Sequence, residues 1–78
     1  MKTKRIYKVE FEEKWSYDRT AWIQDSINVL ANGDAAAAIK KAKKSVLRKT
    51  FFDEEHKRLE KVTGFRLLSV DTIATADI

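Results

Sequence analysis

The apolar residues of this chain change their spacing once, and that change limits the folds open to it. Across residues 5–15 they fall on alternate positions, as in Tyr7 and Phe11, and the alternation continues through residues 21–31. Period-two alternation of aromatic and β-branched residues is typical of half-exposed strands. The sequence therefore predicts two strands joined by a polar turn at residues 16–20, which would form an antiparallel hairpin.

After Asn32-Gly33-Asp34 the apolar spacing becomes that of a helix. Asp34 is a good N-cap, because its carboxylate can accept hydrogen bonds from the free N–H groups of a first helical turn. Ile39 and Val46 follow on one apolar stripe with Ala35 and Ala42. We expect a helix here whose small alanines let it lie close to a sheet.

The second half of the chain is less regular. Thr50-Phe51-Phe52-Asp53 resembles another capping signal and predicts a short helix to about Lys61, either separate or a bent continuation of the first. Gly64 fits the position that follows a helix end. Residues 65–73 are apolar on both faces, which is typical of a covered strand.

These elements predict a single α+β domain over residues 1–78. A hairpin followed by a helical crossover would put the third strand beside the first, giving a three-stranded antiparallel sheet of order 2-1-3 with the main helix on one face. The other face would stay open or meet a partner, so a homodimer could form through it.

Composition argues against an enzyme. The chain has no cysteine and one histidine, so thiol nucleophiles and thiolate metal sites are excluded. His56 lies among charged residues, where a solvated surface is the simpler interpretation, and the pairs Glu12/Glu13 and Glu54/Glu55 would point apart. No glycine-rich phosphate loop is present. We therefore expect no catalytic site, no metal and no cofactor.

The chain also lacks any long apolar run that could form a membrane helix or a signal-peptide core. Together with the absence of cysteine, which suits a reducing compartment, this predicts a cytoplasmic protein that does not enter a membrane.

Positive charge is concentrated in the predicted helix. The formal net charge is +4, yet six basic residues and a single acid lie between Asp34 and Phe52. Four of them form one exposed stripe: Lys40, Lys41, Lys44 and Arg48. Such a stripe could follow the phosphates of a nucleic acid, which makes a nucleic-acid-binding domain using residues 39–49 the alternative function. The simpler interpretation is that these residues form the solvent-exposed face of an amphipathic helix.

Three aromatic residues, Trp15, Tyr17 and Trp22, lie around the predicted hairpin turn. Tryptophan and tyrosine are enriched at protein interfaces, because they combine a large apolar area with a polar group. We expect at least one of the three to anchor a partner, the alternative being that they cap a small core. Asp25 is unusual on a face otherwise made of isoleucine and valine. A bulge, an edge position or a contact to a basic group would explain it.

The layout around this helix resembles a group of known proteins. A strand leads into an acid-capped helix that reads Ala35-x-x-Ala38-Ile39-x-x-Ala42, and a later strand opens with Gly64-Phe65. This layout is similar to small phage-encoded inhibitors of host RNA polymerase and to anti-CRISPR proteins. The resemblance implies a non-enzymatic protein that inhibits or adapts a larger host complex handling nucleic acid. It assigns no binding residues.

Overall fold

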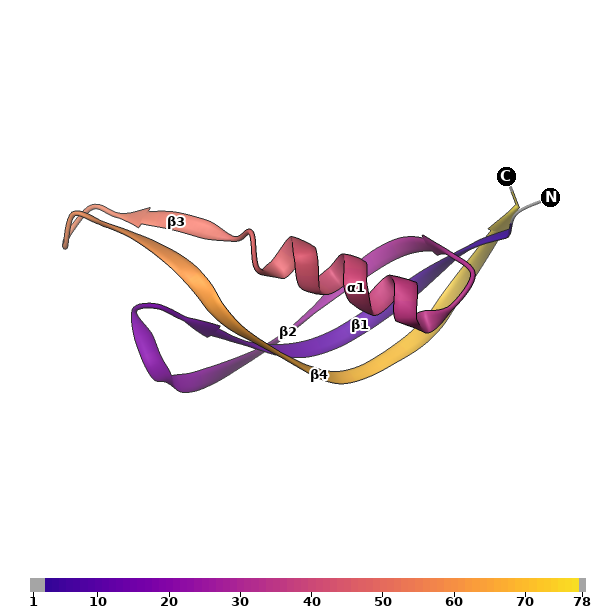
Figure 1. The fold of residues 1–78 in the computed structure, drawn as a ribbon, viewed down its shortest axis with the longest axis horizontal. Coiled ribbons are helices and arrows are strands. Elements are labelled where there is room, and N and C mark those ends of the chain that lie inside the picture. Colours follow the sequence, from indigo (N-terminus) through magenta and orange to yellow (C-terminus); the bar gives the residue numbers. More distant parts are fainter. Residues whose placement is uncertain (1–2, 78) are drawn as a thin grey trace.

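The computed structural model describes residues 3–77, and the side chains of residues 4–74. The chain is α+β, with one antiparallel sheet and one helix (Figure 1). The elements follow in the order β1 (Thr3–Trp15), β2 (Asp18–Asn32), α1 (Ala35–Val46), β3 (Thr50–Asp53) and β4 (Arg58–Asp77). In the sheet they lie in the order β2-β1-β4-β3.

The predicted hairpin is confirmed, with longer strands and a tighter turn. β1 and β2 pair from Lys4↔Asn32 to Trp15↔Asp18, with an irregularity next to the turn. Only residues 16–17 form the turn, because β2 already begins at residue 18. The odd-numbered side chains of β1 from residue 7 to residue 13 face α1, and all four, Tyr7, Val9, Phe11 and Glu13, are buried.

The helix begins where the sequence predicts. Asp34 has extended backbone angles, and its carboxylate accepts a hydrogen bond from the N–H of Ala37 at 3.0 Å. Gly33 adopts a positive φ of 89°, which glycine tolerates without steric cost and which turns the chain back over the sheet. Tyr7 fixes this turn, because its hydroxyl donates to the Gly33 carbonyl at 3.0 Å.

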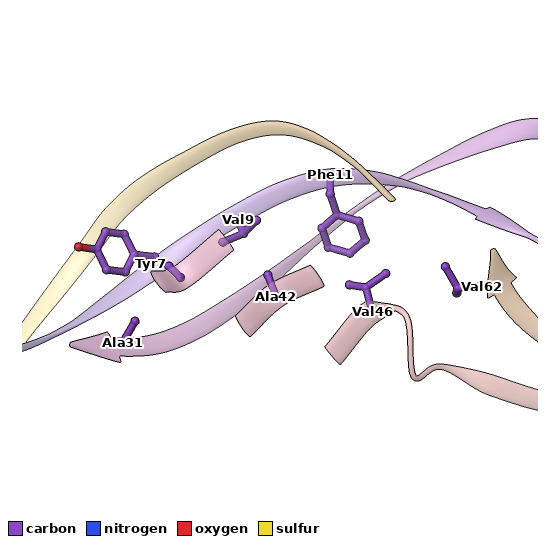
Figure 2. Close-up of a cluster of buried hydrophobic side chains, with 8 residues drawn as sticks. Tyr7, Val9, Phe11, Ala31, Ala42, Val46 and Val62 are labelled. Carbon is purple, nitrogen blue, oxygen red and sulfur yellow. The ribbon is translucent and has the colours of Figure 1, made fainter. Parts of the chain in front are cut away.

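The core is a single layer between α1 and one face of the sheet (Figure 2). The helix contributes three residues that solvent does not reach, Ala38, Ala42 and Val46, whereas Ile39 of the predicted stripe is only partly buried. Alanines at the contact let the helix axis come close to the strands. The buried set is completed by Tyr7, Val9, Phe11, Ala31 and Val62.

The sheet has four strands, so the predicted three-stranded sheet is wrong in its number, although its order β2-β1-β4 is present. The extra strand replaces the short helix predicted over residues 51–61. Thr50, Phe51 and Phe52 are β-branched or aromatic, which suits an extended backbone. The Asp53 carboxylate does accept hydrogen bonds from the backbone N–H groups of Glu55 and His56, but these hydrogen bonds close a turn rather than begin a helix.

Gly64 was predicted to follow a helix end, and this is also wrong, because it lies inside β4. A side chain at this position would approach the Trp22 ring within 3.2 Å, so the glycine leaves room for the ring to pack on the strand. β4 is long because it serves two partners. Residues 62–77 pair with β1, and residues 58–61 pair with β3.

The molecule is long and narrow, with extents of 50 × 21 × 15 Å and a radius of gyration of 14.8 Å. A compact chain of this length would have a radius of about 11.5 Å. The β1–β2 turn and the β3–β4 hairpin extend to one end, and Thr3 and Asp77 pair at the other (Figure 1). Much of each strand therefore remains in contact with solvent.

Candidate functional site

Aromatic residues from two hairpins meet at the end of the molecule that carries both turns. The ring of Trp15, at the end of β1, lies 5.8 Å from that of Tyr17 and 5.4 Å from that of Phe51 in β3. Tyr17 and Phe51 also meet edge to face at 5.7 Å. The cluster therefore joins the turn of one hairpin to the strand of the other.

Two further apolar side chains lie on the other face of the β3–β4 hairpin. Phe52 and Leu59 are partners in the strand register, and they are 55% and 65% exposed. Tyr17 and Phe51 are 49% and 45% exposed. We call this set the aromatic tip; it comprises Trp15, Tyr17, Phe51, Phe52 and Leu59.

Hydrogen bonds around Ser16 hold the two hairpins of the tip together. The backbone N–H of Ser16 donates to the Lys61 carbonyl at 2.8 Å, and the Ser16 hydroxyl accepts from the Lys61 N–H at 2.9 Å. The same hydroxyl donates to Oε1 of Glu60, which is a buried carboxylate, at 3.0 Å. The tip is thus built on backbone hydrogen bonds, which fix the relative position of its aromatic rings.

Trp22 does not join this cluster, although the sequence places it near the same turn. It lies on the sheet face away from α1, packed over Gly64. The ammonium of Lys14 lies 4.5 Å from its ring centroid, and the guanidinium of Arg66 lies 4.3 Å away. Arg66 in turn forms an ion pair with Glu12 at 2.8 Å. These contacts hold Trp22 within a charged network on the open face.

The four basic residues predicted to form one stripe on the helix also do not all lie at one site. Lys40, Lys41 and Lys44 are exposed on α1 and line a hollow of about 390 Å³, whose other walls are Ala31, Asn32 and Ala37. Arg48 lies in the turn after the helix and does not line it.

A second hollow of about 260 Å³ also has Lys41 in its wall, together with Ser45 and residues 27–30 of β2. The two hollows share Lys41 and lie between α1 and residues 27–32 of β2, and we call them together the lysine groove. Its lining residues are Ile27, Asn28, Val29, Leu30, Ala31, Asn32, Ala37, Lys40, Lys41, Lys44 and Ser45.

His56 is exposed in the β3–β4 turn, and its Nδ1 lies 2.8 Å from the Asp53 carboxylate. Hydrogen bonds from the His56 ring and backbone lower the pKa of Asp53. Within the described residues the structure gives this pair no hydroxyl partner. Nor do the described side chains, residues 4–74, contain three His, Asp or Glu residues close enough to hold a metal ion.

No helix in the described part of the chain is long and apolar enough to cross a membrane. Comparison with known proteins finds no matching family model, no similar curated protein and no similar solved structure. The resemblance to phage-encoded inhibitors therefore stays a prediction.

Sequence reasoning missed three members of the aromatic tip, Phe51, Phe52 and Leu59. The prediction of a short helix to about Lys61 placed these residues on a helix, where the structure has the β3–β4 hairpin. The signal that could have found them is the run Thr50-Phe51-Phe52, which favours a strand, followed by the polar stretch 53–58, which favours a turn.

Proposed function

We propose that this protein is a non-enzymatic protein-binding module that engages its partner through the aromatic tip. The single observation that carries the proposal is the exposure of four large apolar side chains, Tyr17, Phe51, Phe52 and Leu59, on one projecting end. Exposed apolar side chains gathered at one end of a molecule, here on both faces of the β3–β4 hairpin, are costly for a free monomer and usually mark an interaction site. Aromatic anchors at such sites contribute most of the binding energy.

The shape of the tip indicates what kind of surface it meets. It projects from the end of a long molecule, so its partner needs a concave apolar surface to receive it. Each of three hollows in the described part of the chain, including the one lined by Ile27, Val29 and Leu30, has a charged side chain in its wall, so none is the wholly apolar surface that the tip needs. A different protein is therefore a better partner than a second copy.

The resemblance to phage-encoded inhibitors supplies a class of such partners. We extend the proposal to an inhibitor or adaptor that inserts the tip into a larger host complex handling nucleic acid. In this proposal the nucleic acid itself is not the ligand of the tip, since the aromatic rings lie away from the lysine groove.

The test compares tip variants with a matched variant at the opposite end. Tyr17→Ala and Leu59→Ala should each cost about 2 kcal/mol in affinity for a partner captured from nuclease-treated host lysate, as anchor truncations do. Because both side chains are exposed, their melting temperatures should stay near that of the unmodified protein. Ile73→Ala removes an apolar side chain of similar exposure, 51%, far from the tip and should bind normally.

Two results would overturn the proposal. In one, the Ile73→Ala variant loses as much affinity as the tip variants, which would make the loss nonspecific. In the other, the purified protein associates with itself in sedimentation experiments and Leu59→Ala abolishes that association, which would make the tip a homodimer contact.

A further inference from the structure

The edge of β2 is long, exposed and poorly protected. β2 is an outer strand of the sheet, and its paired residues, 18 and 23–32, pair on one side only, with β1. Natural edge strands are usually guarded by lysines, prolines or bulges against pairing with another chain. Between Thr20 and Asn32 this strand has no proline and one charged residue, Asp25. Apart from the Leu30 carbonyl, to which Lys41 donates a hydrogen bond, such an edge is open to an added strand.

The lysine groove runs along the same edge. Residues 27–32 of β2 form one wall, and the exposed face of α1 forms the other. Lys40, Lys41 and Lys44 contribute three positive charges, and none of the lining residues is acidic. The ligand that this wall attracts is therefore anionic.

The backbone in this wall selects the kind of anion. Lys41 donates a hydrogen bond to the carbonyl of Leu30, so an edge carbonyl faces the groove. In an antiparallel strand the N–H and C=O of one residue point to the same side, so edge carbonyls alternate with edge N–H groups. A peptide backbone carries both donors and acceptors and can pair with this alternating edge, whereas a phosphate can only accept. The lining residues also include no aromatic ring on which a base could stack.

The spacing of the lysines suits an extended peptide as well. Lys40 and Lys44 are one helical turn apart, about 6 Å along the axis. Side chains on one face of a strand repeat every second residue, about 6.8 Å. Acidic residues at alternate positions of an added strand would thus meet successive lysines on α1.

From these observations we propose that the lysine groove binds an extended acidic segment of another protein, which adds as a strand to the edge of β2. Its signature is an acidic residue at every second position. This interface is separate from the aromatic tip and does not depend on the function proposed for it. A second copy of β2 is a poorer occupant, because residues 27–32 carry no acidic side chain to meet the lysines.

The probe is a synthetic ten-residue peptide of alternating glutamate and threonine, tested on the full chain at low salt. We expect it to bind and to slow amide hydrogen exchange of residues 27–32. The triple variant Lys40→Gln/Lys41→Gln/Lys44→Gln should weaken this binding about tenfold or more, since it removes the opposing charges. The matched triple variant Lys43→Gln/Arg48→Gln/Lys61→Gln loses the same charge outside the groove and should bind nearly as well as the unmodified protein.

Two peptide controls separate strand addition from simple charge attraction. A peptide with glutamine in place of glutamate should bind far more weakly. A peptide N-methylated at every residue keeps its charge but has no backbone N–H group with which to pair, and it should not bind. Tip variants such as Leu59→Ala should leave peptide binding unchanged, so the two proposals can fail independently.

Three outcomes would overturn the inference. The first is equal binding of the N-methylated peptide, or no protection of residues 27–32. The second is preferential binding of a single-stranded oligonucleotide that depends on the same three lysines, which would make the groove a nucleic-acid site. The third is concentration-dependent dimerisation that protects these residues without any peptide.

Discussion

The ammonium nitrogen of Lys49 lies 2.8 Å from the carboxylate of Glu13, which is 36 positions away in the sequence. Glu13 is buried on the helix face of β1, and Lys49 reaches it from the loop between α1 and β3. The same ammonium lies 3.4 Å from Asp25 on β2. Lys49 thereby ties the end of the helix to two strands, and this contact explains why an acid stands among the apolar residues of β2.

Replacing Lys49 should be more harmful than replacing the whole pair. Lys49→Met leaves the Glu13 carboxylate buried without its cation, and we expect a loss of about 3 kcal/mol, the low end for a buried pair because Lys49 is partly exposed. The double variant Glu13→Gln/Lys49→Met removes the stranded charge and should recover much of the loss. Urea unfolding measures both. Equal instability of the two variants would contradict a role for the ion pair.

The pH dependence of this pair has a definite sign. Burial is the largest single effect on Lys49 and lowers its pKa, but the hydrogen bonds and charges of Glu13 and Asp25 together outweigh it and raise the pKa above 10.5. The stabilisation from the pair is therefore complete below 10.5 and is lost as the pH rises through the higher folded value. The stability difference between the unmodified protein and Lys49→Met should stay constant from neutral pH to about pH 10 and then shrink. A difference that grew with pH would have the wrong sign.

The two large apolar residues of the predicted helix stripe should differ in their effect on stability. Val46 is fully buried between α1 and the sheet, and Ile39 is only partly buried. Val46→Ala and Ile39→Ala should each lower the free energy of unfolding by roughly 1–4 kcal/mol. Per unit of side-chain volume removed, Val46→Ala should cost more than Ile39→Ala. The measurement is the midpoint of urea unfolding for each variant, compared at an unchanged slope of the unfolding free energy against urea concentration. An unaffected midpoint for Val46→Ala would mean that this helix face is not inward.

Gly64 and Trp22 should behave as a coupled pair. A methyl group at position 64 would lie 3.2 Å from the Trp22 ring and 3.3 Å from the Lys14 side chain, so the ring must shift. Gly64→Ala should cost about 1 kcal/mol or more, as overpacking does, and the cost should fall when Trp22→Phe provides a smaller ring. Tryptophan emission should also move in Gly64→Ala. Strictly additive costs would show that the ring does not rest on this glycine.

Local signals were sufficient for the first half of the fold. The alternation around Tyr7 and Phe11, the glycine turn and the Asp34 cap all act over a few residues, so they could be predicted from the sequence. The β3–β4 hairpin could not, because Asp53 binds backbone N–H groups in a helix cap and in a tight turn alike. The choice between them depends on Thr50–Phe52 pairing with residues 59–61, and that pairing is not visible in a local pattern.

The candidate sites show the same division. Exposed lysines on α1 follow from helical spacing, but their position beside the free edge of β2 follows only from how the helix folds back. Trp15 and Trp22 are close in sequence, yet they lie on different faces of the sheet. Trp15 packs against the core, and Trp22 packs over Gly64 on the face away from α1. Phe51 reaches Trp15 because β4 holds β3 beside the first hairpin, which is a contact between distant segments.

The place of β1 in the sheet also has a consequence for how the chain folds. β1 is the first strand to be made, and it lies between β2 and the last strand, β4. Thr3 pairs with Asp77, so the sheet is completed only when nearly the whole chain is present. A single hairpin is marginally stable in water, and pairing between distant segments is slow to form. During synthesis, β1 should therefore keep one edge unpaired until β4 leaves the ribosome. In refolding experiments, the pairing of β4 with β1 should be the rate-limiting step.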